Sequence, residues 1–239
     1  MKFVSAERYI SRIQHTFCNN VAKTKVMTDM MIQTNALAYT YPGGRVIRFP
    51  DLACRAGETL LITGPSGSGK TTLLHLLAGL IRPNEGSVQV AGTALGNLGT
   101  RKMDAFRGKH IGIIFQRSHF IDSLSVSDNL TLPLQLTGAP VDRSRLETVA
   151  GDLRIGHLLD KLPARLSQGE QQRASIARAV LQSPEVILAD EPTASLDDHN
   201  CESVARLLSE QAARHNAALL IVTHDNRLTS LYPQHIQLT

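Results

Sequence analysis

The sequence has few aromatic residues and no long apolar run. It contains four tyrosines, six phenylalanines and no tryptophan. This is little aromatic surface on which to stack bases, so a nucleic-acid partner is not expected. The longest apolar run, residues 73–81, is about half the ~18–20 residues that a membrane-spanning helix needs, and it contains His75. We therefore expect that the chain does not cross a membrane by itself.

Cysteine is also scarce. Cys18, Cys54 and Cys201 are the only three, they stand far apart, and they form no Cys-x-x-Cys pair. This spacing indicates neither a zinc site nor a disulfide framework. A reduced, cytosolic setting fits the pattern best.

The overall composition is that of a folded domain. The 239 residues are 42% hydrophobic and 19% charged, and the net charge is +4. This length fits one domain, or one domain that carries a sub-domain. Residues 1–32 hold five basic and two acidic residues, so they account for most of the net charge. The excess positive charge is therefore concentrated in residues 1–32, which we call the leader.

The leader, residues 1–32, has no uninterrupted apolar segment of the kind found in secretory signals. Met27, Met30 and Met31 cluster at its end. Two hypotheses are open. Translation starts at Met30 or Met31, or the leader is a short basic, amphipathic arm that contacts lipid or a partner. We expect the organised domain to span residues 33–239.

Strand and helix patterns alternate after the leader. Short, mostly apolar runs predict strands at residues 60–63, 111–115, 186–189 and 218–223, and the alternation of polar and apolar residues over 87–90 predicts a further strand. Apolar periodicity predicts helices at residues 70–80 and 198–214, and helical structure over 126–182 with breaks near 138–140 and 162–163. The alternation predicts an α/β fold with a mostly parallel sheet and an inserted helical sub-domain.

A phosphate-binding loop joins the first strand to the first helix. It matches the pattern G-x-x-x-x-G-K-[ST] with Gly64, Pro65, Ser66, Gly67, Ser68, Gly69, Lys70, Thr71 and Thr72. Glycines let the backbone approach phosphate closely, and successive N–H groups at the start of a helix attract anions. Lys70 can neutralise the β and γ phosphates, and the Thr71 hydroxyl can ligate Mg²⁺.

Two adjacent carboxylates end a second apolar strand. Asp190 and Glu191 follow residues 186–189, where the carboxyl edge of a parallel sheet opens onto a ligand. We expect Asp190 to bind Mg²⁺ beside Thr71. Glu191 is expected to point elsewhere and to act as the general base for the attacking water.

A second candidate phosphate site lies at another helix start, at Ser167, Gln168, Gly169 and Glu170. Ser167 and Glu170 form the S-x-x-E pattern of a capping box, which gives both a structural role. A serine hydroxyl and a bare glycine at a helix N-terminus can also bind phosphate. Because this helix belongs to the helical insertion, we expect the site to serve the nucleotide of a second copy of the chain.

Taken together, these motifs resemble the ATP-binding subunit of ABC transporters over residues 33–239. The loop resembles Walker A, the strand ending in Asp190 and Glu191 resembles Walker B, and residues 166–170 resemble the LSGGQ signature. The resemblance assigns four further positions: Tyr41 under the adenine, Gln116 as the Q-loop ligand of Mg²⁺ or water, Asp197 in the D-loop, and His224 as the switch histidine. Taken singly, Tyr41 could be an ordinary core tyrosine, and Asp197 could simply cap the helix that follows.

The resemblance implies a mechanism and partners. Two chains enclose two ATP molecules head to tail, with Glu191, His224 and Lys70 as catalytic residues and with Thr71, Gln116 and Asp190 at Mg²⁺. It also implies an N-terminal antiparallel β part, a helical sub-domain over about residues 117–183, and a separate membrane permease that docks near residues 117–121. The expected location is the cytoplasmic face of the inner membrane.

One departure concerns the signature, which reads LSQGE with Gln168 where glycine is usual and Glu170 where glutamine is usual. We expect activity because Ser167 and Gly169 are retained; an inert signature is the alternative. Residues 106–117, 128–134 and 189–197 resemble the branch that serves lipoprotein release and macrolide export. The competing functions are an ABC ATPase that controls cell division or signalling through a permease-like protein, and a soluble ABC ATPase without a transport role.

Overall fold

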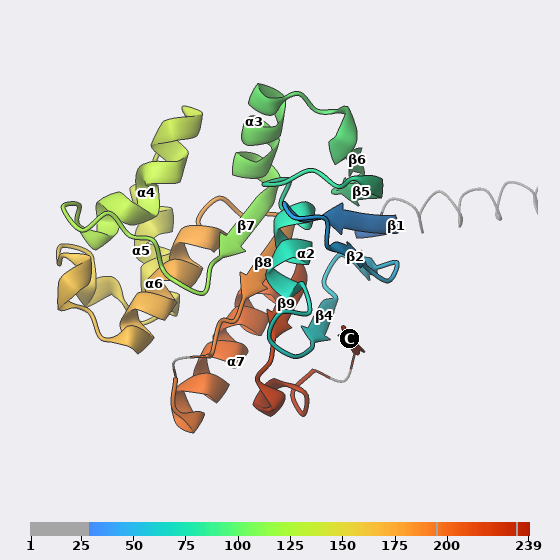
Figure 1. The fold of residues 1–239 in the computed structure, drawn as a ribbon. Coiled ribbons are helices and arrows are strands. Elements are labelled where there is room, and N and C mark those ends of the chain that lie inside the picture. Colours follow the sequence, from blue (N-terminus) through green and yellow to red (C-terminus); the bar gives the residue numbers. More distant parts are fainter. Residues whose placement is uncertain (1–28, 195, 233) are drawn as a thin grey trace, which may run out of the picture.

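The computed structural model describes residues 29–194, 196–232 and 234–239. Residues 1–28 of the expected leader lie outside the described residues. The first strand, β1, spans Met30–Thr40, so it begins slightly before the boundary expected at residue 33. The described residues form two five-stranded sheets with α-helices packed beside them (Figure 1).

The first sheet is antiparallel. In it β1 pairs with β2 (Val46–Arg48), β3 (Ala53–Arg55) and β5 (Glu85–Val90), and β5 pairs with β6 (Thr93–Ala94). The register of β1 against β5 shifts between Asn35 and Ala38, where Ala36 adopts a positive φ of 46°. This is the antiparallel β part expected near the N-terminus.

The second sheet is parallel, in the order β10-β4-β9-β8-β7. Its strands are β4 (Thr59–Thr63), β7 (Ile111–Ile114), β8 (Val186–Asp190), β9 (Ala218–Thr223) and β10 (His235–Gln237). Because all five run in the same direction, their carboxyl ends meet at one edge. The loops after β4, β7, β8 and β9 therefore converge there.

The central strands are apolar throughout because both faces of the parallel sheet are covered. Side chains alternate between two hydrophobic cores. Ile187, Leu219 and Ile221 belong to one core, which they share with the helices between residues 126 and 214. Leu188 and Leu220 belong to the other core, which they share with the helix at residues 70–77 and the antiparallel sheet. The sheet is thus the wall between the two cores.

Six α-helices surround this framework in the described part of the chain. They are α2 (Lys70–Leu77), α3 (Thr100–His110), α4 (Val126–Thr137), α5 (Arg143–Asp152), α6 (Gln168–Val180) and α7 (Asp198–Arg214). Short 3-10 turns lie at Leu95–Asn97, Gly156–Leu158, Pro163–Arg165 and Asn226–Leu228. In Figure 1, α4, α5 and α6 stand together at one side of the molecule, beyond β7.

The sequence pattern predicts more helix between α5 and α6 than the structure contains. Helix α5 ends at Asp152, and Arg154 follows with a positive φ of 57°, a conformation that cannot continue a right-handed helix. Two 3-10 turns fill the segment up to Ser167. Helix α3 is not predicted from the sequence. Met103 is its only buried residue, so its apolar periodicity is weak.

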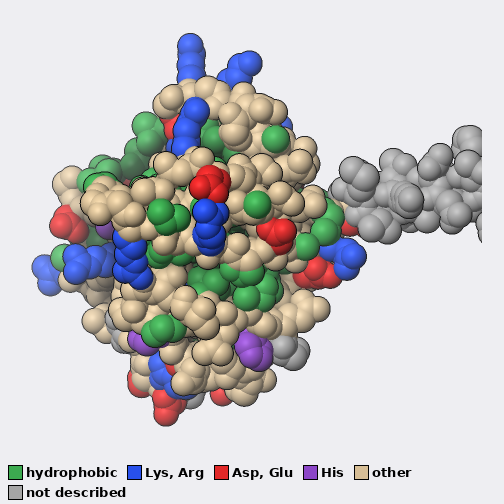
Figure 2. Space-filling view, turned by 45° about the vertical axis from the view of Figure 1, so that its right-hand side comes forward, with side chains coloured by type: hydrophobic (Ala, Val, Ile, Leu, Met, Phe, Trp, Pro, Cys, Tyr) green, Lys and Arg blue, Asp and Glu red, His purple; other side chains and the backbone are tan. Residues whose placement is uncertain are grey.

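The described surface is mixed in character. On the face shown in Figure 2, Lys and Arg side chains lie interspersed with Asp and Glu side chains and with hydrophobic ones. Within the described residues, no helix has the length and apolar character required to cross a membrane.

The approach of β7 to the end of α6 generates a stability prediction. A Cβ on Gly112 would lie 2.4 Å from the backbone oxygen of Ala179 and 3.0 Å from Cγ of Pro184. Gly112→Ala should lower the free energy of unfolding by about 1–3 kcal/mol, because backbone must move to admit the methyl group. Denaturant unfolding measures this change.

Gly151→Ala is the matched control. Gly151 lies in α5, and within the described part of the chain a Cβ added to it would meet nothing within 4 Å outside the backbone of its own helix. Alanine there should raise stability by about 0.5–1 kcal/mol through helix propensity alone. Equal effects of the two substitutions would contradict the close contact at Gly112.

Candidate functional site

The loop between β4 and α2 wraps around the amino group of its own lysine. Lys70 Nζ donates to the backbone oxygens of Gly64 at 2.8 Å and Pro65 at 3.0 Å, and the residue is only 7% exposed. Gly67 and Gly69 have φ values of 82° and 93°, which L side chains rarely adopt. These two glycines allow the loop to curl back over the start of α2.

Thr71 and Asp190 meet below this loop. Thr71 Oγ1 donates to Asp190 Oδ1 at 3.3 Å, joining the first turn of α2 to the end of β8. Asp190 is buried, and burial raises the pKa of its carboxyl group above the ordinary value. A buried carboxylate beside a hydroxyl is a pair of hard oxygen donors.

Glu191 diverges from Asp190, as predicted, but for a different reason. It lies one residue beyond β8, and its φ of 48° is in the left-handed region. Such strain in a residue that is not glycine is typical of functional sites. The turn of the backbone, rather than the alternation of a strand, aims this side chain away from Asp190.

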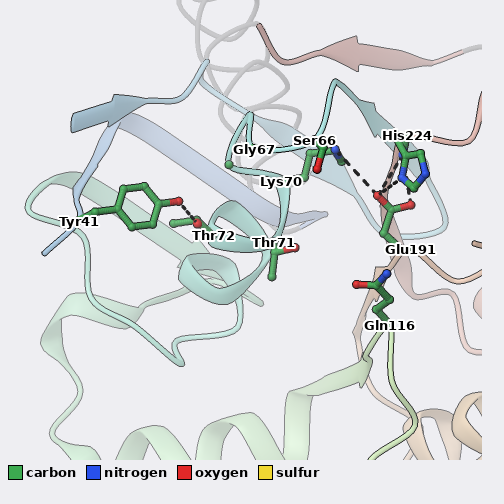
Figure 3. Close-up of a pocket in the computed structure, with 10 residues that line it drawn as sticks. Tyr41, Ser66, Gly67, Lys70, Thr71, Thr72, Gln116, Glu191 and His224 are labelled. Atoms are coloured by element: carbon green, nitrogen blue, oxygen red, sulfur yellow. Dashed lines mark hydrogen bonds and ion pairs between the residues drawn. The ribbon is translucent and has the colours of Figure 1, made fainter. Parts of the chain in front are cut away.

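The Glu191 carboxylate gathers donors from the end of β9. It accepts from the Thr223 hydroxyl at 2.7 Å and from the His224 backbone N–H at 3.1 Å. It also contacts His224 Nδ1 at 2.7 Å and lies 3.9 Å from Lys70 Nζ (Figure 3). With Nδ1 held by the carboxylate, the other ring nitrogen, Nε2, is left for a ligand. The carboxylate is thus oriented by three neighbours.

One pocket collects most of the predicted nucleotide-binding and catalytic residues. Its lining consists of Tyr41, Ser66, Gly67, Gly69, Lys70, Thr71, Thr72, Gln116, Glu191 and His224. Figure 3 shows Tyr41 at one side, bonded through its hydroxyl to Thr72, with Glu191 and His224 at the other and Gln116 nearby. Of the remaining loop residues, Gly64 and Pro65 hold Lys70, and Ser68 is buried.

The signature residues line a different pocket. Ser167, Gln168, Gly169 and Glu170 stand there with Arg173, Leu196, Asp197 and Asn200. The capping box predicted at the start of α6 is present: the Ser167 hydroxyl and backbone N–H each donate to Glu170 Oε2 at 2.8 Å. Asp197 caps α7, as predicted, by accepting from the Asn200 N–H at 2.8 Å.

Sequence reasoning did not single out Thr223, Arg173 or Asn200. Thr223 is buried and orients Glu191, and its position directly before His224 is the signal that could have found it. Arg173 and Asn200 reach the second pocket from α6 and α7. Nothing in their spacing distinguishes them from the other polar residues of those helices.

Oxygen donors that line the first pocket, and Asp190 beside it, suit Mg²⁺. Thr71 offers a hydroxyl, Asp190 a carboxylate and Gln116 an amide oxygen. Among residues 29–194, 196–232 and 234–239, no group of three His, Cys, Asp or Glu side chains is placed to hold a metal ion. Mg²⁺ is commonly bound by one or two carboxylates together with substrate phosphates.

A family model described as "ABC transporter" matches residues 48–194, which is more than half of the chain. The chain belongs to the ABC transporter family. The match covers the loop at residues 64–72, the signature residues and the two carboxylates at the end of β8, Asp190 and Glu191. It establishes the ABC ATPase class and, with it, ATP binding and hydrolysis.

The chain is similar to proteins named "lipoprotein-releasing system ATP-binding protein LolD". With that of Hydrogenovibrio crunogenus it is 37% identical over 219 residues, which are 89% of this chain and 95% of the relative. With that of Psychrobacter arcticus it is 40% identical over 191 residues, which are 79% of this chain and 84% of the relative.

Solved structures agree with this family. The ATP-binding cassette MJ0796, as a dimer in a post-hydrolysis state bound to ADP and Pi, matches with a TM-score of 0.79 and 30% identity over 87% of this chain and 94% of that one. A second dimeric structure of MJ0796, a bacterial ABC transporter cassette, has the same TM-score and 31% identity, with the same shares of both chains. The predicted fold class is confirmed.

The burial of Asp190 generates a prediction about stability and metal. Because burial raises its pKa, the ionised carboxylate destabilises the protein, and stability is lost as pH rises through the raised pKa. With EDTA at neutral pH, Asp190→Asn should therefore raise the melting temperature. With ATP present, Mg²⁺ should stabilise the wild type and not the variant, because the charged ligand is gone.

The exposed Asp122→Asn is the control. It should leave both the melting temperature in EDTA and the response to Mg²⁺ and ATP unchanged. An Asp190→Asn protein that responds to Mg²⁺ and ATP as the wild type does would contradict the assignment of Asp190 as a metal ligand.

Proposed function

We propose that this chain is the ATPase subunit of a lipoprotein-releasing type of ABC transporter and works as a head-to-tail dimer on a membrane permease. The observation that supports this most directly is the separation of two half-sites on one chain. The first pocket holds Lys70, Glu191 and His224, whereas Ser167 and Gly169 line the second. In a dimer, the second pocket of each chain would complete the first pocket of the other.

The residues of the first pocket fit phosphoryl transfer to water. Lys70 and the N–H groups at the start of α2 bind the β and γ phosphates. The water oxygen attacks the γ phosphorus, the bond to the β–γ bridging oxygen breaks, and Glu191 takes the proton from the water. Thr223 and the His224 N–H hold the Glu191 carboxylate in place for this role.

Three other groups position the substrate. Tyr41, whose hydroxyl is bonded to Thr72, would stack against the adenine. His224 would contact the γ phosphate through Nε2. Thr71, Asp190 and Gln116 would hold Mg²⁺, which when bound neutralises charge on the phosphates.

The segment after Gln116 connects this pocket to the helical part of the chain. Arg178 of α6 donates to the His119 oxygen at 3.1 Å, and its guanidinium lies 4.8 Å from the Phe120 ring centroid. Asn129 of α4 accepts from the Ile121 N–H at 2.7 Å. Ile121 itself is 44% exposed. We place the permease contact on this segment, which puts the subunit on the cytoplasmic face of the membrane.

The proposed contacts also suggest how the chain divides into a domain and a sub-domain. We propose an ATPase domain over residues 33–239 with a helical sub-domain over about residues 117–183 that carries the permease contact and the signature. Helices α4, α5 and α6 all fall within this range.

Replacing Glu191, the proposed general base, should stop ATP hydrolysis without preventing ATP binding. Glu191→Gln keeps the size of the side chain but cannot accept the proton, so ATP hydrolysis should fall by about 10²-fold or more. ATP should still bind, and the variant should accumulate as an ATP-bound dimer in analytical ultracentrifugation.

Glu185→Gln provides the control, since Glu185 lies just before β8 and its side chain is 52% exposed. This variant should hydrolyse ATP at the wild-type rate. Normal turnover by Glu191→Gln would refute the base assignment.

A bulky cation at the signature should block the second half-site without affecting the first. Ser167→Arg should abolish ATP hydrolysis and ATP-driven dimerisation, because the side chain would fill the space meant for the partner's nucleotide. Binding of ATP to the monomer should remain, as equilibrium binding of a fluorescent ATP analogue can show.

The exposed Ser144→Arg, on α5, controls for the added charge and should behave as the wild type. Hydrolysis that survives Ser167→Arg would argue against a nucleotide shared between two chains.

A further inference from the structure

Arg227 lies three residues beyond His224, in the 3-10 turn Asn226–Leu228. Its guanidinium forms a bidentate ion pair with the Asp225 carboxylate: Nε donates to Oδ1 at 2.9 Å, and Nη2 donates to Oδ2 at 2.7 Å. The Arg227 backbone N–H also donates to Asp225 Oδ1 at 3.0 Å. These hydrogen bonds lower the pKa of Asp225 to about 2, so this carboxylate is a fixed negative charge.

The same guanidinium also reaches the segment that joins β8 to α7. Nη1 donates to the Leu196 backbone oxygen at 3.2 Å and to Asp198 Oδ1 at 2.6 Å. Nη2 lies 3.5 Å from the Thr193 backbone oxygen. Arg227 thus contacts this segment near its start, near its middle and at the first residue of α7.

Asp225 links this contact to the catalytic pair. The Thr193 hydroxyl donates to Asp225 Oδ2 at 2.9 Å. On the other side, the Asp225 N–H donates to the Thr223 hydroxyl oxygen at 2.9 Å, and that hydroxyl donates to Glu191 at 2.7 Å. A continuous series of hydrogen bonds therefore runs from the general base to Arg227.

The segment that Arg227 holds also forms part of the second pocket. Leu196 and Asp197 line that pocket together with the signature residues. The position of this segment thus decides how Leu196 and Asp197 stand relative to Ser167. This segment follows Glu191 directly in the chain and leads to the surface that would contact the partner's nucleotide.

The number and kind of acceptors distinguish this contact from an ordinary surface ion pair. The Arg227 side chain is 38% exposed, and a single ion pair at that exposure contributes little to stability. Here one planar group serves two carboxylates and two backbone oxygens, a set that the fixed fork of arginine can reach and the single ammonium of lysine cannot. Such a contact fixes geometry more than it adds stability.

We propose that Arg227 is a positioning residue that holds Thr193, Leu196 and Asp198 in a fixed position relative to Glu191 and His224. The first and second pockets of one chain would then keep a constant distance and orientation. This inference rests on the proposed head-to-tail dimer. Arg227 would not touch nucleotide in its own pocket. Its loss should impair assembly of the composite site and leave the first pocket intact.

Arg227→Lys is the decisive variant because it keeps a positive charge beside Asp225 and so preserves the fold. In the wild-type background, kcat for ATP hydrolysis should fall about 10- to 100-fold, as expected when a catalytic arrangement is displaced. In the Glu191→Gln background, the ATP-bound dimer should dissociate at about tenfold higher protein concentration in analytical ultracentrifugation. In the Ser167→Arg background, the monomer should bind the fluorescent ATP analogue within about twofold of its parent.

Arg206→Ala is the matched control. Arg206 lies on α7 and forms an exposed ion pair with Glu202, with its side chain 69% exposed. This variant should match the wild type in kcat and its Glu191→Gln parent in dimer dissociation. Any fall comparable to that of Arg227→Lys would overturn the inference, because the effect would then not be specific to Arg227.

Two further results would also overturn the inference. One is an Arg227→Lys protein with normal kcat and normal dimerisation, even at a lower melting temperature, because Arg227 would then be merely structural. The other is an equal loss of ATP affinity in the Ser167→Arg background, which would place the effect in the first pocket. Absence of ATP-driven dimers in the Glu191→Gln parent itself would contradict the proposed function, and the inference with it.

Discussion

The arrangement of the site depends on one buried positive charge. Lys70 is almost fully buried, and a buried ammonium group is costly unless polar partners surround it. Its partners are the carbonyls of Gly64 and Pro65 and, at 3.9 Å, the Glu191 carboxylate. These partners come from the ends of two parallel strands, β4 and β8. The parallel sheet is therefore what brings a lysine and its counter-charge to one edge, where phosphate can replace or join them.

Glu191 in turn depends on the strand between those two. Strand β9 lies between β4 and β8, and its end supplies Thr223 and His224 to the carboxylate. The Glu191 carboxylate is thus oriented from one neighbouring strand, while the backbone of Glu191 adopts a positive φ. Such a conformation persists only where the surroundings over-determine it. Three donors to one carboxylate, together with the Glu191 N–H bonded to the Val222 oxygen at 2.9 Å, provide that constraint.

Most of the fold and the first pocket could be predicted from sequence because buried parallel strands and phosphate loops have strong local patterns. Residues 186–189 and 218–222 are continuous apolar runs, and the loop at 64–72 has a fixed spacing. Helix α3 and the 3-10 turns before α6 have no such signal, because they bury few side chains. The interactions of Arg227 could not be predicted either. They join positions up to 34 residues apart, and only the tertiary fold brings these together.

The structure accounts for the unusual signature sequence LSQGE, in which Gln168 stands where glycine is usual. Gln168 is the first residue of α6, its side chain is exposed, and its φ is not positive, so the fold of the subunit does not require glycine there. At Gly169, apart from the backbone of its own helix, a Cβ would approach within 4 Å only Asn200 Oδ1 among the described residues, at 3.8 Å, which is ordinary contact. Neither position is restricted by packing within one chain. Any requirement for a bare backbone at Gly169 must therefore come from a molecule that approaches from outside, as the partner's nucleotide would in a head-to-tail dimer.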